Sequence, residues 1–159
     1  MPDTVLRVDS PEGLLDAVVN HGVSPAMLHG ITAEQLEAIY SLCHDDLMAG
    51  RFEEGRERAS FLLRNEPWDR RFHMAFAFAL QNLGQHESAG QFYASAFEMD
   101  ATDAVCALRI GECLSALNEL DEAREAFEAA VKLSWLDAQH EEVREKAQAY
   151  LDLLTDVGA

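Results

Sequence analysis

The residues of this chain that could carry out chemistry do not fall into a catalytic or metal-binding spacing. Cys106 and Cys113 are separated by six residues, unlike the shorter spacing of a zinc-binding pair. His140 stands where a helix could begin, but no second histidine follows four positions later. The adjacent acids at 45–46 and 53–54 point their side chains apart on a helix. With no glycine-rich phosphate loop either, we expect no enzyme activity, no cofactor and no metal.

The other candidate reactive groups fit structural roles. The cysteines all fall inside helix-like stretches, at small-residue or inward-facing positions; they are Cys43, Cys106 and Cys113. Free cysteine is among the most often buried residues and disulfides are rare in the cytosol, so we expect reduced, buried thiols. His73 also stands at an inward-facing position, where we expect a hydrogen-bonded, buried histidine.

Composition restricts the class of partner. The chain has 159 residues, 48 % of them apolar, enough for one domain with a substantial core. Its net charge is −17 and its pI about 4.5, which disfavours nucleic acid and anionic membranes and favours basic or apolar partners. No basic N-terminal region precedes an apolar run, and no apolar stretch approaches ~20 residues. We therefore expect no signal peptide, no transmembrane helix and a cytoplasmic location.

A spacing of 34 residues predicts the elements that position these side chains. Gly50, Gly84 and Asn118 follow one another at this interval, each between two helix-like stretches. Because Gly and Asn tolerate φ > 0, we expect a left-handed turn residue at each. Other positions repeat in the same register: Gly55, Ala89 and Ala123; Ala59, Tyr93 and Phe127; Leu62, Ala96 and Ala130. Three helix–turn–helix units of this length predict an all-α tetratricopeptide-repeat solenoid, a scaffold that holds a peptide.

The chain divides into four expected segments. They are a disordered stretch at 1–9, an N-terminal helix and lead-in at 10–31, three repeats at 32–137 (about 36–69, 70–103 and 104–137), and a C-terminal capping helix and tail at 138–159. Ser10 and Pro11 can start the N-terminal helix, and Thr32 with Gln35 forms a capping box for the first repeat. A closing helix is expected because the last repeat of a solenoid leaves an apolar face bare.

One face of the first helix in each repeat is expected to pack on the second helix. Its members are Ile39, Leu42, Cys43 and Asp46; His73, Phe76, Ala77 and Leu80; Ala107, Ile110, Gly111 and Leu114. Ala77 and Gly111 are small, as expected where two helix backbones approach closely. Asp46 departs from the common repeat pattern, which has tyrosine there, and the sequence gives no reason for a buried acid.

A second face of the same helices is expected to line the concave side of the stack. The candidate groove residues on it are Tyr40, His44, Leu47, Met74, Phe78, Gln81, Val105, Leu108 and Glu112. Most are apolar, and an apolar groove costs solubility unless something fills it, so we predict a ligand site. The alternative is that the N-terminal segment folds back over this face. His44 fits either a polar anchor or pH sensor, or an ordinary hydrogen-bonded groove residue.

Several stretches carry a resemblance to a known family. They are GVSPAMLHGIT (22–32), LEAIYSLCHDDLMAGRFEEG (36–55), RRFHMAFAFALQNLGQHESAGQFYASAFEMD (70–100) and GECLSALNELDEA (111–123). Together they resemble the class II chaperones of type III secretion systems, the SycD/LcrH/IpgC-like proteins. The strongest motifs are residues 39–42 and the turn at 83–85, and the resemblance covers about residues 12–135.

The resemblance implies a cytosolic bacterial chaperone that keeps hydrophobic, pore-forming translocator subunits soluble, apart and secretion-competent. The client would supply an extended PxLxxP-like segment to the concave groove, where proline and leucine need apolar pockets. His44 is a departure, since the resemblance implies an aromatic residue there. The resemblance also implies a homodimer, for which the apolar stripe of the N-terminal helix is the candidate contact: Leu14, Leu15, Val18 and Val19.

Three other functions are alternatives to this one. A co-chaperone that binds an acidic C-terminus would need Lys, Arg and Asn at set groove positions, and only Arg109 matches that carboxylate clamp. An enzyme would need a catalytic domain for which the chain has no room. A regulatory protein that binds a transcription factor is compatible with the sequence, which does not decide this point.

Overall fold

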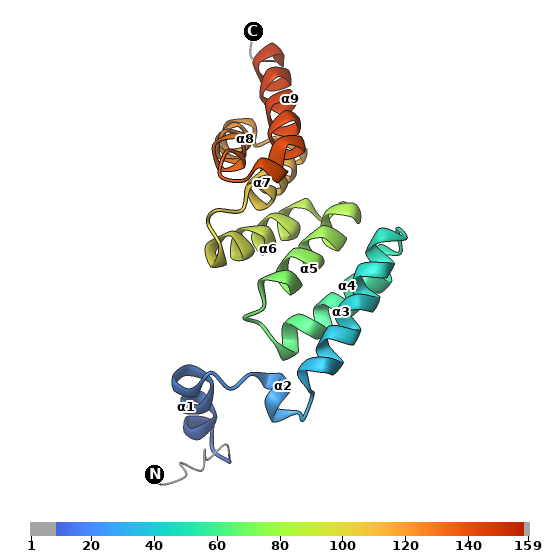
Figure 1. Ribbon diagram of the computed structural model, residues 1–159, viewed down its shortest axis with the longest axis vertical. Helices are drawn as coiled ribbons and strands as arrows, with labels where there is room; N and C mark the ends of the chain where they lie inside the picture. The colour runs from blue at the N-terminus through green and yellow to red at the C-terminus, as the bar shows by residue number, and fades with distance from the viewer. Residues whose placement is uncertain (1–8, 158–159) are drawn as a thin grey trace.

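The computed structural model describes residues 9–157, so the stretch expected to be disordered lies outside it except for Asp9. From α3 onward the helices form antiparallel pairs that stack along the long axis of the molecule, with α9 at the top of the view (Figure 1). Their bounds are α1 Pro11–His21, α2 Pro25–Leu28, α3 Ala33–Met48, α4 Phe52–Asn65, α5 Arg70–Asn82, α6 His86–Met99, α7 Ala104–Ala116, α8 Leu120–Ser134, the short 3₁₀ helix η1 Ala138–His140, and α9 Glu141–Val157. The all-α solenoid predicted from the repeat is confirmed.

The turn inside each repeat is built in the same way. φ is positive at each predicted residue: +75° at Gly50, +77° at Gly84 and +63° at Asn118. In each turn the next residue donates its N–H to the carbonyl five positions back, at 2.8–2.9 Å. This left-handed cap satisfies carbonyls that the end of the first helix would otherwise leave unpaired. The repeat period therefore reflects one recurring helix-ending motif.

Side chains also fix where the first helix of each repeat begins. Thr32 and Gln35 form the predicted capping box at α3, with the Gln35 amide oxygen 2.9 Å from the Thr32 N–H. Asp69 and Asp103, 34 positions apart, accept N–H groups at the starts of α5 and α7. Such caps stabilise a helix by about 1 kcal/mol each, so each repeat carries its own start signal.

Inward-facing residues on the second helix of every repeat form part of the core. The repeated positions that face inward are at most 1 % exposed; they are Ala59, Tyr93 and Phe127, and Leu62, Ala96 and Ala130. Gly111 is small for a reason other than the expected backbone approach, because an added Cβ would lie 2.6 Å from the Phe127 ring. The glycine thus makes room for an aromatic side chain from α8.

The prediction that Leu42 packs on the core face of the first repeat is wrong, since its side chain is 53 % exposed. Its equivalent in the second repeat, Phe76, packs against the core clusters on both of its sides. Leu42 lies in the first repeat, where no preceding repeat covers that position. The same sequence offset is therefore partly buried inside the solenoid and exposed in its first repeat.

The buried acid of the first repeat has cationic partners. Asp46 Oδ1 accepts hydrogen bonds from Arg51 Nε at 2.8 Å and Nη2 at 2.6 Å, and Oδ2 forms an ion pair with Arg58. Its side chain is only 7 % exposed, whereas both arginines reach solvent. A paired and hydrogen-bonded carboxylate can be buried where an isolated one cannot.

The two ends of the chain differ. At the C-terminal end, α9 packs on α7 and α8 with Ala147 and Leu154 buried, as expected of a capping helix. At the N-terminal end, α1 stands away from the stack, and Ala17 is its buried residue (Figure 1). Leu14, Leu15 and Val19 are between 40 % and 68 % exposed. Across residues 9–157, no helix combines the length and apolar character needed to cross a bilayer.

Candidate peptide-binding groove

A hollow of about 410 Å³ runs along the first helices of the three repeats. The residues that line it come mainly from α3, α5 and α7; they are Tyr40, His44, Leu47, Met48, Arg71, Met74, Ala75, Phe78, Tyr93, Val105 and Arg109. We call this hollow the groove. Its floor is largely aromatic and aliphatic, with polar groups at its edges, which is the composition of a ligand site.

The structure brings together a large part of the predicted set. Among the predicted groove residues, those that line the hollow are Tyr40, His44, Leu47, Met74, Phe78 and Val105. The alternative in which the N-terminal segment covers this face finds no support within residues 9–157, because α1 and α2 contribute nothing to the lining. His44 is exposed at the edge of the groove.

Gln81, Leu108 and Glu112 lie outside the hollow. Leu108 is 4 % exposed and packs in the core that α7 shares with α9. Lys146 of α9 reaches Glu112, with Nζ 2.7 Å from Oε1. The capping helix therefore covers the C-terminal part of the concave face, which repeat spacing alone could not reveal.

Other groove residues were missed. Tyr93 comes from α6, a second helix of a repeat, and Met48 and Ala75 fall at helix offsets assigned to neither face. Arg71 stands on the predicted concave face and Arg109 beside it, but neither is among the predicted groove residues. The signal that could have found Arg71 is its position 34 residues after Glu37, with which it pairs.

Arg71 marks the α3–α5 side of the groove and is fully neutralised. Its guanidinium donates to both carboxylate oxygens of Asp69 and to both of Glu37, with Nη2 2.6 Å from Asp69 Oδ2. It also lies over the Tyr40 ring, 5.0 Å from the centroid. The ion pairs fix the position of the Arg71 guanidinium, and its stacking on the Tyr40 ring holds that ring in place in the groove.

Arg109 marks the α7 side and belongs to a longer network. Its Nη1 donates to Glu112 Oε2 at 2.9 Å, and the guanidinium lies 5.3 Å from the centroid of Phe78. Gln81 donates to the same Glu112 oxygen at 2.9 Å and accepts from the Tyr93 hydroxyl at 2.8 Å. The network joins α5, α6, α7 and α9 directly behind the groove.

Burial and pairing shift the pKa values of groups near the groove. Burial would raise the pKa of Glu112, but hydrogen bonds from Lys146 and Gln81 and the charge of Arg109 hold it below its ordinary value. Burial raises the pKa of the Cys43 and Cys113 thiols to about 11. All cysteines are free and buried, which confirms the predicted reduced thiols and leaves them protonated at neutral pH.

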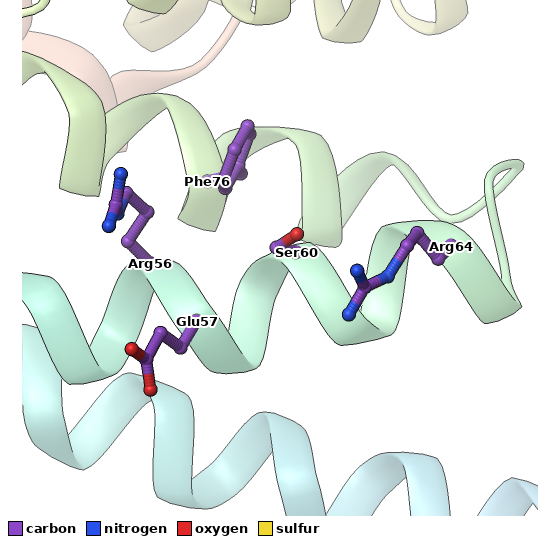
Figure 2. Close-up of a pocket in the computed structure, with 5 residues that line it drawn as sticks. All are labelled: Arg56, Glu57, Ser60, Arg64 and Phe76. Carbon is purple, nitrogen blue, oxygen red and sulfur yellow. The ribbon is translucent and has the colours of Figure 1, made fainter.

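A second hollow lies on the opposite side of α5 and has a different character. It measures about 480 Å³ and is lined by Arg56, Glu57, Ser60, Arg64 and Phe76 (Figure 2). The polar side chains come from α4, and Glu57 points away from Phe76 toward α3 (Figure 2). It lacks an apolar floor, so the groove is the better candidate for an apolar segment. In the part of the chain described, no cluster of His, Cys, Asp or Glu could hold a metal ion.

The helix pairs, their left-handed turn residues and the hollow along their first helices define a tetratricopeptide-repeat solenoid. Comparison with known families agrees, since the tetratricopeptide-repeat model matches residues 83–134. The low calcium response locus protein H of Yersinia pestis is 24 % identical over 140 residues, which cover 88 % of this chain and 83 % of that protein.

Solved structures give the same result. The Yersinia enterocolitica type III secretion translocator chaperone SycD is 26 % identical, with a TM-score of 0.76 over 83 % of this chain and 98 % of that one. PcrH of Pseudomonas aeruginosa, solved in complex with the chaperone-binding region of PopD, is 26 % identical with a TM-score of 0.78 over 82 % of this chain and 98 % of that one. The resemblance to class II translocator chaperones seen in the sequence is confirmed.

Proposed function

We propose that this chain is a cytoplasmic bacterial chaperone of type III secretion. It binds hydrophobic translocator subunits through the groove and keeps them soluble, unassociated and competent for secretion. In this role it acts by binding and not by catalysis. A chain with a net charge of −17 suits such a role, because a strongly charged surface keeps a complex with an apolar client in solution.

The observation that carries the proposal is the apolar groove, in a chain whose fold resembles that of a chaperone solved with a translocator segment. PcrH, which shares this fold over most of the chain, is solved with the chaperone-binding region of PopD. Tyr40, Met74 and Phe78 supply the aromatic and thioether surface here. Such side chains adapt to apolar partners, and an extended peptide laid across several of them gains affinity from pockets for alternate side chains.

The groove can be tested by co-expression with a translocator and pull-down. We expect Tyr40→Ala and Phe78→Glu to abolish capture, because one removes a wall and the other places a charge in the apolar floor. Leu153→Glu is the matched control, since Leu153 is 62 % exposed on α9 and lies outside the groove. Undiminished capture by both groove variants, with helical content intact by circular dichroism, would refute the groove assignment.

We further propose that the apolar stripe of α1 forms a homodimer contact. Leu15 and Val19 are 64 % and 68 % exposed on a helix that stands away from the stack. Large exposed apolar side chains on one face of a helix mark interaction sites more often than random surface. Leu15→Asp should shift the protein toward monomer in light scattering, whereas an unchanged mass would exclude this stripe as the contact.

A further inference from the structure

The two arginines that line the groove differ in how completely they are neutralised. Arg71 faces two carboxylates, Asp69 and Glu37, and donates to all four of their oxygens. Arg109 faces one carboxylate, Glu112, through a single hydrogen bond. Glu112 is in turn shared with Lys146, whose Nζ lies 2.7 Å from its other oxygen. One cation thus meets two anions at the Arg71 side, and two cations meet one anion at the Arg109 side.

The Arg109 side chain is held in place and still has donors to offer. Its guanidinium is stacked on Phe78, 5.3 Å from the ring centroid, and its side chain is 28 % exposed. Within residues 9–157, its Nε and Nη2 donate to no protein group. A guanidinium carries five N–H donors in its plane, so stacking occupies its face and leaves the in-plane donors available to a ligand.

We propose that Arg109 is a specificity-determining residue that pairs with an acidic side chain of the client segment, next to the apolar residues that fill the groove. This inference rests on the proposed function, because it assumes that a client occupies the groove. The unpaired donors form a fork that matches a carboxylate, and the local excess of positive charge favours an anion over a neutral carbonyl. Glu112 holds the guanidinium in the orientation that presents this fork.

The same asymmetry sets the direction of the client. A carboxylate placed beside Arg71 would approach Asp69 and Glu37, whose oxygens already surround that guanidinium. Like charges at that distance repel, so an acidic residue is disfavoured at this side of the groove and favoured at the other. An extended segment with one acidic residue would therefore lie in one orientation along α3, α5 and α7.

The test is a glutamate scan of a model peptide, measured by fluorescence anisotropy. The parent is a labelled, uncharged peptide with a P-x-L-x-x-P core in which every other position is Gln or Ala. Each Gln is changed singly to Glu. We expect Glu at one position, or at two adjacent ones, to lower Kd about tenfold through a charged hydrogen bond. Glu elsewhere should leave Kd unchanged or raise it, given the acidity of the chain.

Variants of the protein assign the gain to Arg109. Arg109→Gln should bring the ratio of the two Kd values, parent peptide over glutamate peptide on the same variant, close to one, and Arg109→Lys should keep part of the gain because the charge remains. Arg64→Gln is the control, since it removes the same charge from the second hollow, outside the groove. Binding of the parent with no favoured Glu position, or a gain that survives Arg109→Gln, would overturn the inference alone. Failure of the wild type to bind the parent peptide would overturn the groove function and this inference with it.

Discussion

In the first and third repeats, the large side chain that packs over a glycine comes from opposite helices of the pair. In the first repeat, Leu47 of α3 points into the space above Gly55 of α4, where an added Cβ would collide with it. In the third, Phe127 of α8 points into the space above Gly111 of α7. A helix pair can thus interdigitate with the large residue on either helix, provided that a glycine faces it. The period of the repeat is kept while the direction of packing reverses.

The same two repeats each bury a carboxylate. The two carboxylates differ in whether their partners lie within the same repeat or in other elements. Asp46 is bound by Arg51 and Arg58, both within its own repeat. Glu112 is bound by Arg109 of its own helix, by Gln81 of the second repeat and by Lys146 of the capping helix. Changes at Asp46 should therefore stay local, whereas changes at Glu112 should be felt at the groove and at α9.

The largest expected effect comes from removing the aromatic residue of the third repeat. Phe127 is fully buried and its ring stacks on Tyr150 of α9, with centroids 4.6 Å apart. Phe127→Ala should lower the free energy of unfolding by about 4 kcal/mol, since it leaves a cavity between α7, α8 and α9. Urea denaturation measures the loss. The half-buried Phe92 is the control, and a smaller loss for Phe127→Ala than for Phe92→Ala would contradict the packing described.

A reciprocal exchange tests the acid of the first repeat. Leu114 stands at the position of Asp46, but the residues equivalent to Arg51 and Arg58 are Glu119 and Ala126. Leu114→Asp should therefore cost about 3 kcal/mol, because Leu114 is partly buried and a carboxylate in its place finds no cation.

Asp46→Leu, which gives the first repeat the residue of the other two, should change stability by less than about 1 kcal/mol, because its arginines can turn to solvent. Both variants are compared by urea denaturation. Equal losses for the two would show that the position tolerates charge in the same way in every repeat, and that Arg51 and Arg58 do not explain the buried acid.

The repeat period predicted the scaffold because local signals specify each helix pair. Positive φ at Gly50, Gly84 and Asn118, the capping box at Thr32 and the buried small residues all follow from side chains within one repeat. Features that depend on neighbours beyond the repeat could not be predicted in this way. Leu42 is exposed because no repeat precedes its own, and Leu108 is covered because α9 follows.

The groove was predicted best where it depends on one helix face. Tyr40, His44, Leu47, Met74, Phe78 and Val105 share the concave face by spacing alone. Tyr93 was missed because it reaches the groove from α6, between two first helices. Arg71 and Arg109 could not be predicted as groove residues, because the ion pairs that hold them depend on distances between side chains. The 2.9 Å hydrogen bond from Arg109 to Glu112 is one such contact, and no spacing rule gives it.

A smaller effect should separate the two glycines. An added Cβ at Gly111 would lie 2.6–3.0 Å from three atoms of the rigid Phe127 ring, whereas at Gly55 it meets the flexible end of Leu47. Gly111→Ala should therefore cost about 2 kcal/mol. Gly55→Ala should be close to neutral, because Leu47 can change rotamer and alanine favours the helix by about 1 kcal/mol. Thermal denaturation of the two variants gives the order, and a reversed order would contradict the rigid-ring explanation.

The smallest effect concerns the pH dependence of stability and returns to Glu112. Its pKa is held below the ordinary value in the folded protein, so the unfolded chain binds a proton there more readily than the folded one does. The stability that its ion pairs provide is complete above the unfolded-state pKa, about 4.3, and is lost as the pH falls below it. Glu112→Gln should therefore be less stable than wild type at neutral pH and lose less stability between pH 5 and pH 3. Glu128→Gln, an exposed change of equal charge on α8, should leave the acid-range slope as it is.

Because Glu112 also orients Arg109, Glu112→Gln should lower the affinity for a glutamate-bearing peptide, and Asp46→Leu should not. Equal effects of the two variants on this affinity would mean that the first repeat's carboxylate also reaches the groove.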